Sequence, residues 1–138
     1  MRTRGKLATL LASATLASTA LVAGAAPVSA TGPCGSSYSR VGAYAVPESG
    51  TRKGTLEVYY NSSTGKNCAL MYGYGSTANT TTWKSVRIQR SDNTGLDQDG
   101  GNYKYYAGPV YVSAPGQCID VEGSVGQAGV SYWDVHCG

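Results

Sequence analysis

Short runs of alternating apolar and polar residues, separated by clusters of Gly, Asn, Ser and Pro, extend over most of this chain from about residue 38. A period of two is typical of half-buried β-strands, and these runs lack the 3.6-residue period of an amphipathic helix. Strands at this spacing favour an antiparallel sandwich or small barrel. The pattern predicts strands near residues 38–46, 54–61, 66–74, 83–90, 103–106, 109–113, 117–122 and 130–136.

Two further features refine this strand pattern. The segment 91–102 is rich in Asp, Asn and Gly, and it predicts a long polar loop. Pro109 and Pro115 bracket the run 110–113, and a proline lacks the N–H that a central strand needs. We therefore expect an edge strand at that run, within a small all-β fold.

The first thirty residues have the three parts of a secretory signal peptide. A positively charged start is followed by residues 7–26, which carry no charge, and small residues at 28–30 suit a signal peptidase. The uncharged run is long enough to cross a bilayer, but it is rich in Ala, Ser and Thr. We therefore expect residues 1–30 to be a cleaved signal peptide. Residues 31–138 then form a single secreted β domain, with no membrane anchor after cleavage.

The charge pattern argues against one class of partner. Arg2, Arg4 and Lys6 account for the whole formal net charge of +3, and residues 31–138 carry equal numbers of basic and acidic side chains. A protein that binds nucleic acid normally needs a basic field to offset phosphate charge. We therefore expect no nucleic-acid partner.

Four cysteines in a chain made for export predict two disulfides that brace the fold. Three connectivities are possible, and we favour the pairing of sequence neighbours, because the second bridge then closes a segment that looks like a single hairpin. No Cys-x-x-Cys spacing occurs and His136 is the only histidine, so we expect neither a metal site nor a cofactor. The favoured pairs are Cys34–Cys68 and Cys118–Cys137.

Aromatic side chains are the main candidates for ligand binding. The chain holds eleven Tyr and two Trp but no Phe. Alternation places Tyr59, Trp83 and Tyr111 on outward strand faces, with Tyr103 or Tyr105 as further candidates for one stacking platform. Flat rings beside Asn, Gln and Asp suit sugars, which present both C–H faces and hydroxyls. The alternative is that tyrosines replace the missing Phe in the core and at strand edges.

Two polar clusters are weaker candidates for chemistry. Asp97 and Asp99 precede two glycines as in part of a calcium loop, but the other EF-hand ligands are missing, which favours a solvated turn. Asp134 and His136 share a strand face, yet no Gly-x-Ser-x-Gly elbow accompanies them. We therefore expect no catalytic residues and no enzymatic activity.

The last predicted hairpin has two features to weigh: a pair of acidic residues and a local resemblance to a lectin. Asp120 and Glu122 would need a cleft to act as paired carboxylates on a glycoside, and a domain of this size is not expected to have one. The string Cys118-Ile119-Asp120-Val121, with Ser131-Tyr132-Trp133 after it, resembles one repeat of a ricin-type β-trefoil lectin. The resemblance implies the Cys118–Cys137 bridge, and Asp120 is a candidate polar contact for a ligand.

Two longer blocks resemble the spore-associated protein A family of streptomycetes. The first runs from Tyr59 to Cys68, and the second combines residues 99–103 with 106–112, followed by Gly116-Gln117-Cys118. Members of this family are small secreted proteins linked with aerial hyphae and spores, and their molecular activity is not established. The resemblance therefore implies a setting outside the cell and no mechanism.

Together these observations predict a secreted non-enzymatic protein associated with the spore or aerial hyphal surface. One alternative is a lectin-like carbohydrate-binding module, with cell-wall or spore-surface glycan as its partner. Another is a secreted inhibitor of a protease or an amylase that presents residues 91–102 as a rigid loop.

Overall fold

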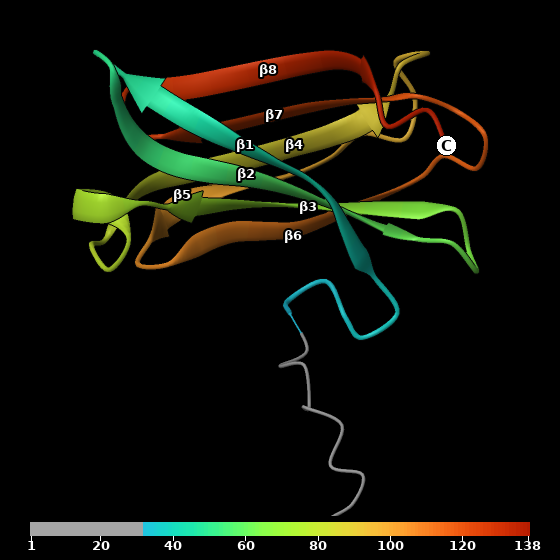
Figure 1. Ribbon diagram of the computed structural model, residues 1–138, viewed down its shortest axis with the longest axis horizontal. Helices are drawn as coiled ribbons and strands as arrows, with labels where there is room; N and C mark the ends of the chain where they lie inside the picture. Colours follow the sequence, from blue (N-terminus) through green and yellow to red (C-terminus); the bar gives the residue numbers. More distant parts are fainter. Residues whose placement is uncertain (1–31) are drawn as a thin grey trace, which may run out of the picture.

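The alternating runs fold into eight antiparallel strands, which form two four-stranded sheets packed face to face (Figure 1). The computed structural model describes residues 32–138, so the predicted signal peptide, residues 1–30, lies outside the described residues. The first sheet has the order β1-β2-β3-β6, with β1 (Ser39–Glu48), β2 (Thr51–Asn61), β3 (Lys66–Gly73) and β6 (Tyr106–Ser113). The second has the order β5-β4-β7-β8, with β5 (Asp97–Tyr103), β4 (Thr82–Arg90), β7 (Ile119–Val125) and β8 (Ala128–Val135).

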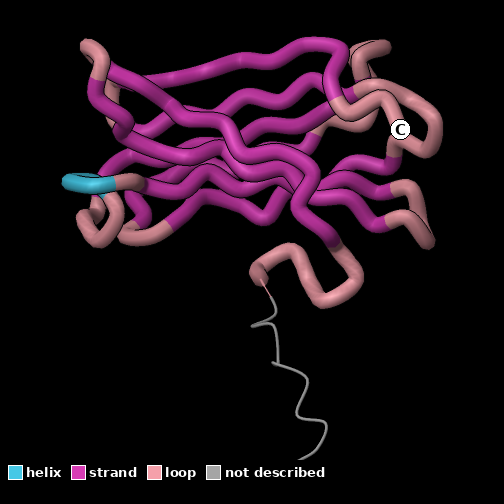
Figure 2. The backbone as a smooth tube through the Cα atoms, in the orientation of Figure 1, coloured by secondary structure: helices cyan, strands magenta, loops and turns pink. Residues whose placement is uncertain are grey.

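The predicted all-β, disulfide-braced fold is therefore confirmed, and it is a sandwich. The backbone of the described residues is mostly strand, with one short 3-10 helix, η1 (Gly75–Thr77), between β3 and β4 (Figure 2). No helix within residues 32–138 has the length and apolar character needed to cross a membrane.

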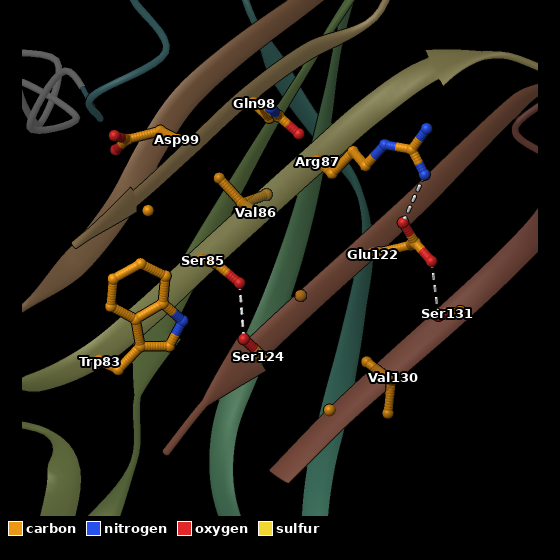
Figure 3. A pocket seen from close by; sticks show the side chains of 13 residues that line it. Trp83, Ser85, Val86, Arg87, Gln98, Asp99, Glu122, Ser124, Val130 and Ser131 are labelled. Atoms are coloured by element: carbon orange, nitrogen blue, oxygen red, sulfur yellow. Dashed lines mark hydrogen bonds and ion pairs between the residues drawn. The ribbon is translucent and has the colours of Figure 1, made fainter. Parts of the chain in front are cut away.

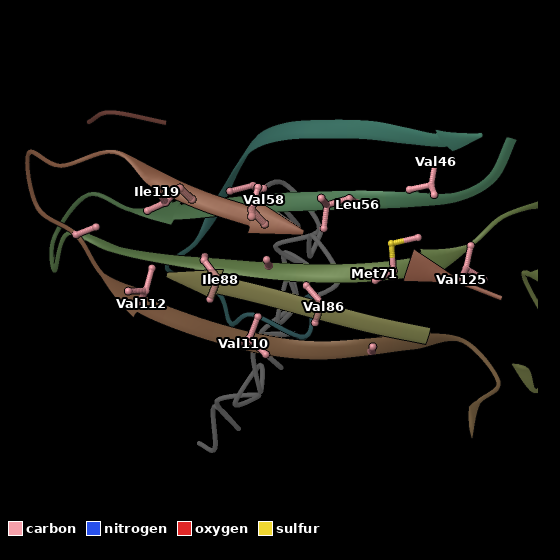
Figure 4. Packing of buried hydrophobic residues seen from close by; sticks show 14 of the residues in the cluster. Val46, Leu56, Val58, Met71, Val86, Ile88, Val110, Val112, Ile119 and Val125 are labelled. Carbon is pink, nitrogen blue, oxygen red and sulfur yellow. The ribbon is translucent and has the colours of Figure 1, made fainter. Parts of the chain in front are cut away.

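Alternate side chains of every strand except β5 point between the sheets and form the core (Figure 4). Leu56 and Val58 of β2 belong to it, as do Val86 and Ile88 of β4, and all four are at most 1% exposed. Burying one side chain of this kind stabilises the fold by about 1.5–3 kcal/mol. The intervening residues of the same strands must therefore point outward, which decides which side chains a ligand can reach.

The outer face of the first sheet is covered by the segment that precedes β1. The Cys34–Cys68 disulfide ties this segment to β3. Cys68 and Leu70 lie on that face, yet both are fully buried. The aromatic rings that pack around them are Tyr38, Tyr59, Tyr72, Tyr106 and Tyr111. A second apolar cluster therefore occupies this face, and the face is not open to a large ligand.

Hydrogen bonds join the two sheets where β5 runs beside β6. The Asp97 carboxylate accepts a hydrogen bond from the Tyr111 backbone N–H at 2.9 Å, and Asp99 accepts one from the Gly108 N–H at 2.8 Å. The Tyr103 hydroxyl also donates to Asp99 at 2.7 Å. β6 is the edge strand of the first sheet, as the flanking prolines predict. The two carboxylates thus give backbone groups of this edge strand the partners that a neighbouring strand would supply.

Aromatic packing joins the sheets at the opposite edge, between β1 and β8. Tyr44 stacks on Tyr132, with ring centroids 4.1 Å apart. The Tyr44 hydroxyl also forms a hydrogen bond of 2.8 Å with His136 Nε2. The sandwich is therefore bridged by side chains along both long edges.

One cation lies inside the molecule, at the end of the sandwich where β3 crosses to β4. Lys84 is fully buried, and its ammonium donates to the backbone carbonyls of Thr80, Tyr103 and Lys104 at 3.0, 2.8 and 3.3 Å. Burial lowers the pKa of Lys84. Its three hydrogen bonds fasten the β3–β4 connection to the turn between β5 and β6.

Two predicted elements are wrong in position. The strand expected at 103–106 falls on a turn, because β5 ends at Tyr103 and β6 begins at Tyr106. The long loop expected at 91–102 is wrong in its second half, which is β5 and pairs with β4. β5 has no apolar alternation, since its inward side chains, Asp97 and Asp99, bond the backbone of β6 instead of packing in the core. The solvated turn expected at Asp97 and Asp99 is therefore wrong, and of the loop expected at 91–102 only residues 91–96 lie outside a strand.

Both disulfides join the predicted pairs. The Cys34–Cys68 bridge anchors the first described segment, and the Cys118–Cys137 bridge closes the β7–β8 hairpin. The pairing of β7 with β8 is also irregular between Ile119 and Val121, in agreement with the bulge that the mixed alternation of the last hairpin indicates.

Candidate functional site

A groove of about 790 Å³ crosses the outer face of the second sheet (Figure 3). Its base is a row of small residues that lie opposite one another in register across all four strands. Because none of these residues has a large side chain, the sheet surface is lower here than on either side. We call this set the small-residue row, and it consists of Gly100 on β5, Ser85 on β4, Ser124 on β7 and Gly129 on β8.

The two serines of this row lie side by side in the middle of the groove. Ser85 Oγ and Ser124 Oγ are 2.5 Å apart and share one hydrogen bond, in which either can be the donor. The other hydroxyl keeps its proton for a second acceptor, and both oxygens keep lone pairs. The centre of the groove can therefore both donate and accept hydrogen bonds.

A second row of long polar side chains borders the groove on one side. These residues are again in register, two positions further along each strand. Arg87 Nη1 donates to Glu122 Oε2 at 2.9 Å, and the Ser131 hydroxyl donates to Glu122 Oε1 at 3.0 Å (Figure 3). We call this set the polar row, and it consists of Gln98 on β5, Arg87 on β4, Glu122 on β7 and Ser131 on β8.

The polar row carries no net charge. Arg87 and Glu122 form a salt bridge, and their side chains are 37% and 30% exposed. A half-exposed pair of this kind contributes little to stability, in the range of about 0–1 kcal/mol. The pair matters more for a ligand, because each charge offsets the other. The row therefore offers hydrogen bonds from N–H groups and oxygen lone pairs without attracting a charged ligand.

Trp83 borders the other side of the groove. Its side chain is 48% exposed, as the outward phase of its strand predicts. The ring lies close over the backbone of Gly100, since a Cβ built at that glycine would be 3.0 Å from the ring. The indole is therefore held against the sheet by a neighbour without a side chain, and it borders the groove as a large exposed aromatic surface.

The single stacking platform expected from Tyr59, Trp83 and Tyr111 is wrong as a group. Tyr59 and Tyr111 pack in the second apolar cluster on the first sheet, whereas Trp83 lies on the outer face of the second. The Tyr59 hydroxyl donates to Glu57 at 2.5 Å, and the Tyr111 hydroxyl donates to the Cys34 carbonyl at 3.1 Å. Alternation gives the correct face within each strand but cannot say which sheet a strand joins.

The two further tyrosine candidates are also apart from the groove. Tyr103 packs against the main core and donates to Asp99. Tyr105 is 53% exposed, but it lies in the turn after β5, where the Lys104 ammonium is 5.3 Å from the centre of its ring. Of the predicted stacking residues, only Trp83 lines the groove.

Asp120 lies on β7, two residues before Glu122, and its carboxylate is occupied by the protein itself. Asp120 Oδ1 accepts hydrogen bonds from the Ser91 hydroxyl at 2.8 Å and from the Asp134 N–H at 3.0 Å. Oδ2 accepts one from Gln89 Nε2 at 3.3 Å. Burial acts to raise the pKa of Asp120, but these hydrogen bonds hold it below its ordinary value. The geometry fits a role in holding the β8 bulge, and ligand contact by Asp120 stays a prediction.

His136 and Asp134 do not form a catalytic arrangement with a serine within residues 32–138. His136 bonds Tyr44, and no serine hydroxyl of the described residues is hydrogen-bonded to its ring. Burial lowers the pKa of His136, so the ring is mainly neutral at pH 7. Within the same described part of the chain, no three His, Cys, Asp or Glu side chains lie close enough to hold a metal ion.

A smaller cavity of about 250 Å³ lies at one end of the sandwich, beside Tyr60, Asn67 and His136. Both polar atoms of the Asn67 side chain are buried and have no hydrogen-bond partner among the described residues. They are also sealed from solvent, so the amide is not available to a ligand that enters this cavity in the present conformation. The groove on the second sheet is the better candidate site.

Sequence reasoning missed most of the groove. Arg87 and Glu122 are 35 positions apart, and only the register of β4 with β7 brings them together. Gln98 lies in a segment that the sequence predicts to be a loop. A usable signal did exist, because Ser85 and Arg87 share the predicted outward face of β4 with Trp83.

Comparison with known proteins gives one informative relative. The chain is 40% identical over 111 residues to a protein named Spore-associated protein A from Streptomyces coelicolor. The match covers 80% of this chain and 68% of that protein. No family model matches the chain, and no solved structure matches it.

Proposed function

The chain belongs to the family of spore-associated protein A, and from this membership we propose that it is a secreted, non-enzymatic protein of the spore or aerial hyphal surface. The observation that carries the proposal is the extent of the likeness, which covers most of the chain. The signal-like first thirty residues support export, since their charge and apolar pattern are those that a secretion system reads.

The carboxylates of the groove support a non-enzymatic role. Glycoside hydrolysis normally needs two carboxyl groups that face one scissile bond. In the groove, Glu122 is paired with Arg87 (Figure 3), and Asp99 accepts a hydrogen bond from the Gly108 N–H. Both carboxylates therefore already have partners within the protein, which supports a non-enzymatic role.

Localisation in a sporulating streptomycete tests the surface proposal. The full chain is expressed with a C-terminal tag, and antibody is applied to intact spores and aerial hyphae. We expect surface labelling, and an extracted protein whose first residue is Thr31. Retention of the uncleaved chain inside the cells would contradict the proposal. A matched variant with Arg2, Arg4 and Lys6 changed to Glu is expected to stay inside, because the signal needs its positive start.

Carbohydrate binding is the second candidate, and the position of Trp83 favours it. A half-exposed indole borders a groove whose base and opposite side carry hydroxyl, amide and guanidinium groups. An aromatic ring packs against the C–H face of a sugar while nearby polar groups bond its hydroxyls. Such binding would also supply a physical means of attachment to a cell wall or spore coat.

Retention on insoluble polysaccharides tests this second candidate. Chitin, cellulose and purified cell wall are incubated with residues 31–138 and washed. We expect retention on at least one of them, with a clear loss for Trp83→Ala. Trp133→Ala is the matched control, because Trp133 is 55% exposed on β8, the edge strand of the same sheet, but does not line the groove. Equal retention of both variants and the unaltered protein would rule out the groove as the binding site.

A further inference from the structure

We propose that the groove binds one linear, uncharged polysaccharide chain that lies across the strands of the second sheet, from β5 to β8. This inference rests on the proposed carbohydrate binding and specifies the ligand's shape, direction and charge. Three features of the described residues carry it: the small-residue row, the different character of the two sides, and the charge balance.

The small-residue row sets the direction. Its members lie opposite one another on adjacent strands, so the lowered strip of surface runs perpendicular to the strands. Four strands span three interstrand spacings, or roughly 14 Å. A strip of that length is longer than a single sugar ring, so it suits several consecutive units of a chain.

The two sides of the groove differ in the contacts that they offer. Trp83 presents an aromatic surface on one side, and the polar row presents N–H groups and oxygens on the other. The small-residue row adds the paired hydroxyls of Ser85 and Ser124 between them. A flat sugar chain has apolar C–H faces and hydroxyl edges, so it can meet the ring and the polar row at the same time.

Charge selects against an anionic polymer. The two charges beside the ligand path, on Arg87 and Glu122, form a salt bridge and offset each other. Asp99, the other charged residue that lines the groove, is bonded to the Gly108 N–H and lies away from the path. A phosphate-rich or uronic-acid polymer would need unpaired cations, whereas a β-linked glucose or N-acetylglucosamine chain needs hydrogen bonds alone.

Gly129 provides a variant that tests the direction of binding. It lies at the β8 end of the small-residue row, far from Trp83, and a Cβ built there meets its neighbours at an ordinary 3.6 Å. Gly129→Gln therefore fills the far end of the groove without forcing the backbone. Ser124→Gln fills the same row from β7, in case the glycine variant folds poorly. Gly32→Gln is the matched control, since nothing lies within 4 Å of a Cβ at that position.

The experiment is calorimetric titration of residues 31–138 with soluble chitin and cellulose oligosaccharides, from monomer to hexamer. We expect affinity to rise with chain length and then to level off once the chain spans the row. Trp83→Ala should weaken every oligomer by about tenfold, because one stacking contact is lost. Gly129→Gln should reduce the affinity for long oligomers to about that for short ones, because it fills the β8 end of the row.

The outcomes separate this inference from the proposal on which it rests. An affinity that does not depend on chain length, or that Gly129→Gln and Ser124→Gln leave unchanged, would overturn the transverse chain while carbohydrate binding remained. Tighter binding to an anionic polymer, weakened by added salt, would overturn the uncharged ligand. Absence of binding to every soluble and insoluble glycan would overturn both.

Discussion

At the scale of single residues, Asp97 and Asp99 show how a polar strand can belong to the fold. Each carboxylate accepts a hydrogen bond from a backbone N–H of β6, and together they hold two sheets that share no ladder at this edge. A hydrogen bond to a charged group is worth about 1.5–3 kcal/mol, more than one between neutral groups. The two aspartates thus have a structural role that residue type and spacing do not reveal.

Removal of the Asp99 carboxylate should destabilise the sandwich. Asp99→Ala leaves the Gly108 N–H and the Tyr103 hydroxyl without their acceptor, so we expect the free energy of unfolding to fall by ~1–2 kcal/mol. Asp99→Asn keeps an oxygen acceptor and should cost less. Urea denaturation measures both, with Glu48→Ala as the control, because Glu48 is an exposed residue at the end of β1. An unchanged midpoint for Asp99→Ala would show that these hydrogen bonds contribute nothing net.

At the scale of elements, apolar alternation predicts the positions of strands well, but its absence does not show that a segment is a loop. β2, β3 and β4 were predicted close to their observed bounds because each buries one face in the core. β5 was predicted as a loop because its inward residues are aspartates, and only their pairing with β6 explains the strand. Local patterns report burial, so a strand held mainly by hydrogen bonds escapes them.

The candidate site shows the same limit between neighbouring elements. Trp83 could be predicted as an exposed residue, since its phase on β4 is opposite to that of Val86 and Ile88. The rows that define the groove could not, because they depend on the register of β5, β7 and β8 against β4. Register between distant segments is a tertiary property that spacing within one segment does not encode.

At the scale of the whole molecule, tyrosine takes the place that Phe has in most cores. Rings on the outer face of the first sheet and at the β1–β8 edge pack against apolar neighbours, with several hydroxyls bonded to the protein. Burial raises the pKa of Tyr72 to about 12, with Glu57 and Tyr106 adding to the shift. Burial, with the hydrogen bond to Glu57, raises the pKa of Tyr59 further. Burial also raises the pKa of Tyr38 and of Tyr44, and the hydrogen bond to Asp99 raises the pKa of Tyr103.

These shifts predict unfolding in alkali. Below the ordinary tyrosine pKa of 10.0 both states hold their protons, so the tyrosine contribution to stability is complete. From pH 10 through about 12 the unfolded chain releases protons that the folded chain keeps, so stability falls as pH rises. Lys84, whose pKa is lowered, acts in the opposite sense, but it is one group against five tyrosines.

The urea midpoint against pH, followed together with tyrosinate absorbance, measures this dependence. We expect the tyrosinate absorbance of the five shifted residues to appear only as the protein unfolds. Full tyrosinate absorbance in a protein that stays folded would contradict the prediction. Tyr72→Phe should shift the alkaline decline to higher pH, because it removes one of the groups that drives it.

The side-chain bridges along both edges of the sandwich bear on how molecules of this protein can crowd together. Exposed strand edges act as templates on which another chain can add a strand, and such additions lead to fibres. Here Asp97 and Asp99 occupy N–H groups of β6, and Tyr44 and Tyr132 cover the β1–β8 edge. Copies of this protein brought close together are therefore expected to stay separate molecules at these edges and not to join by adding strands.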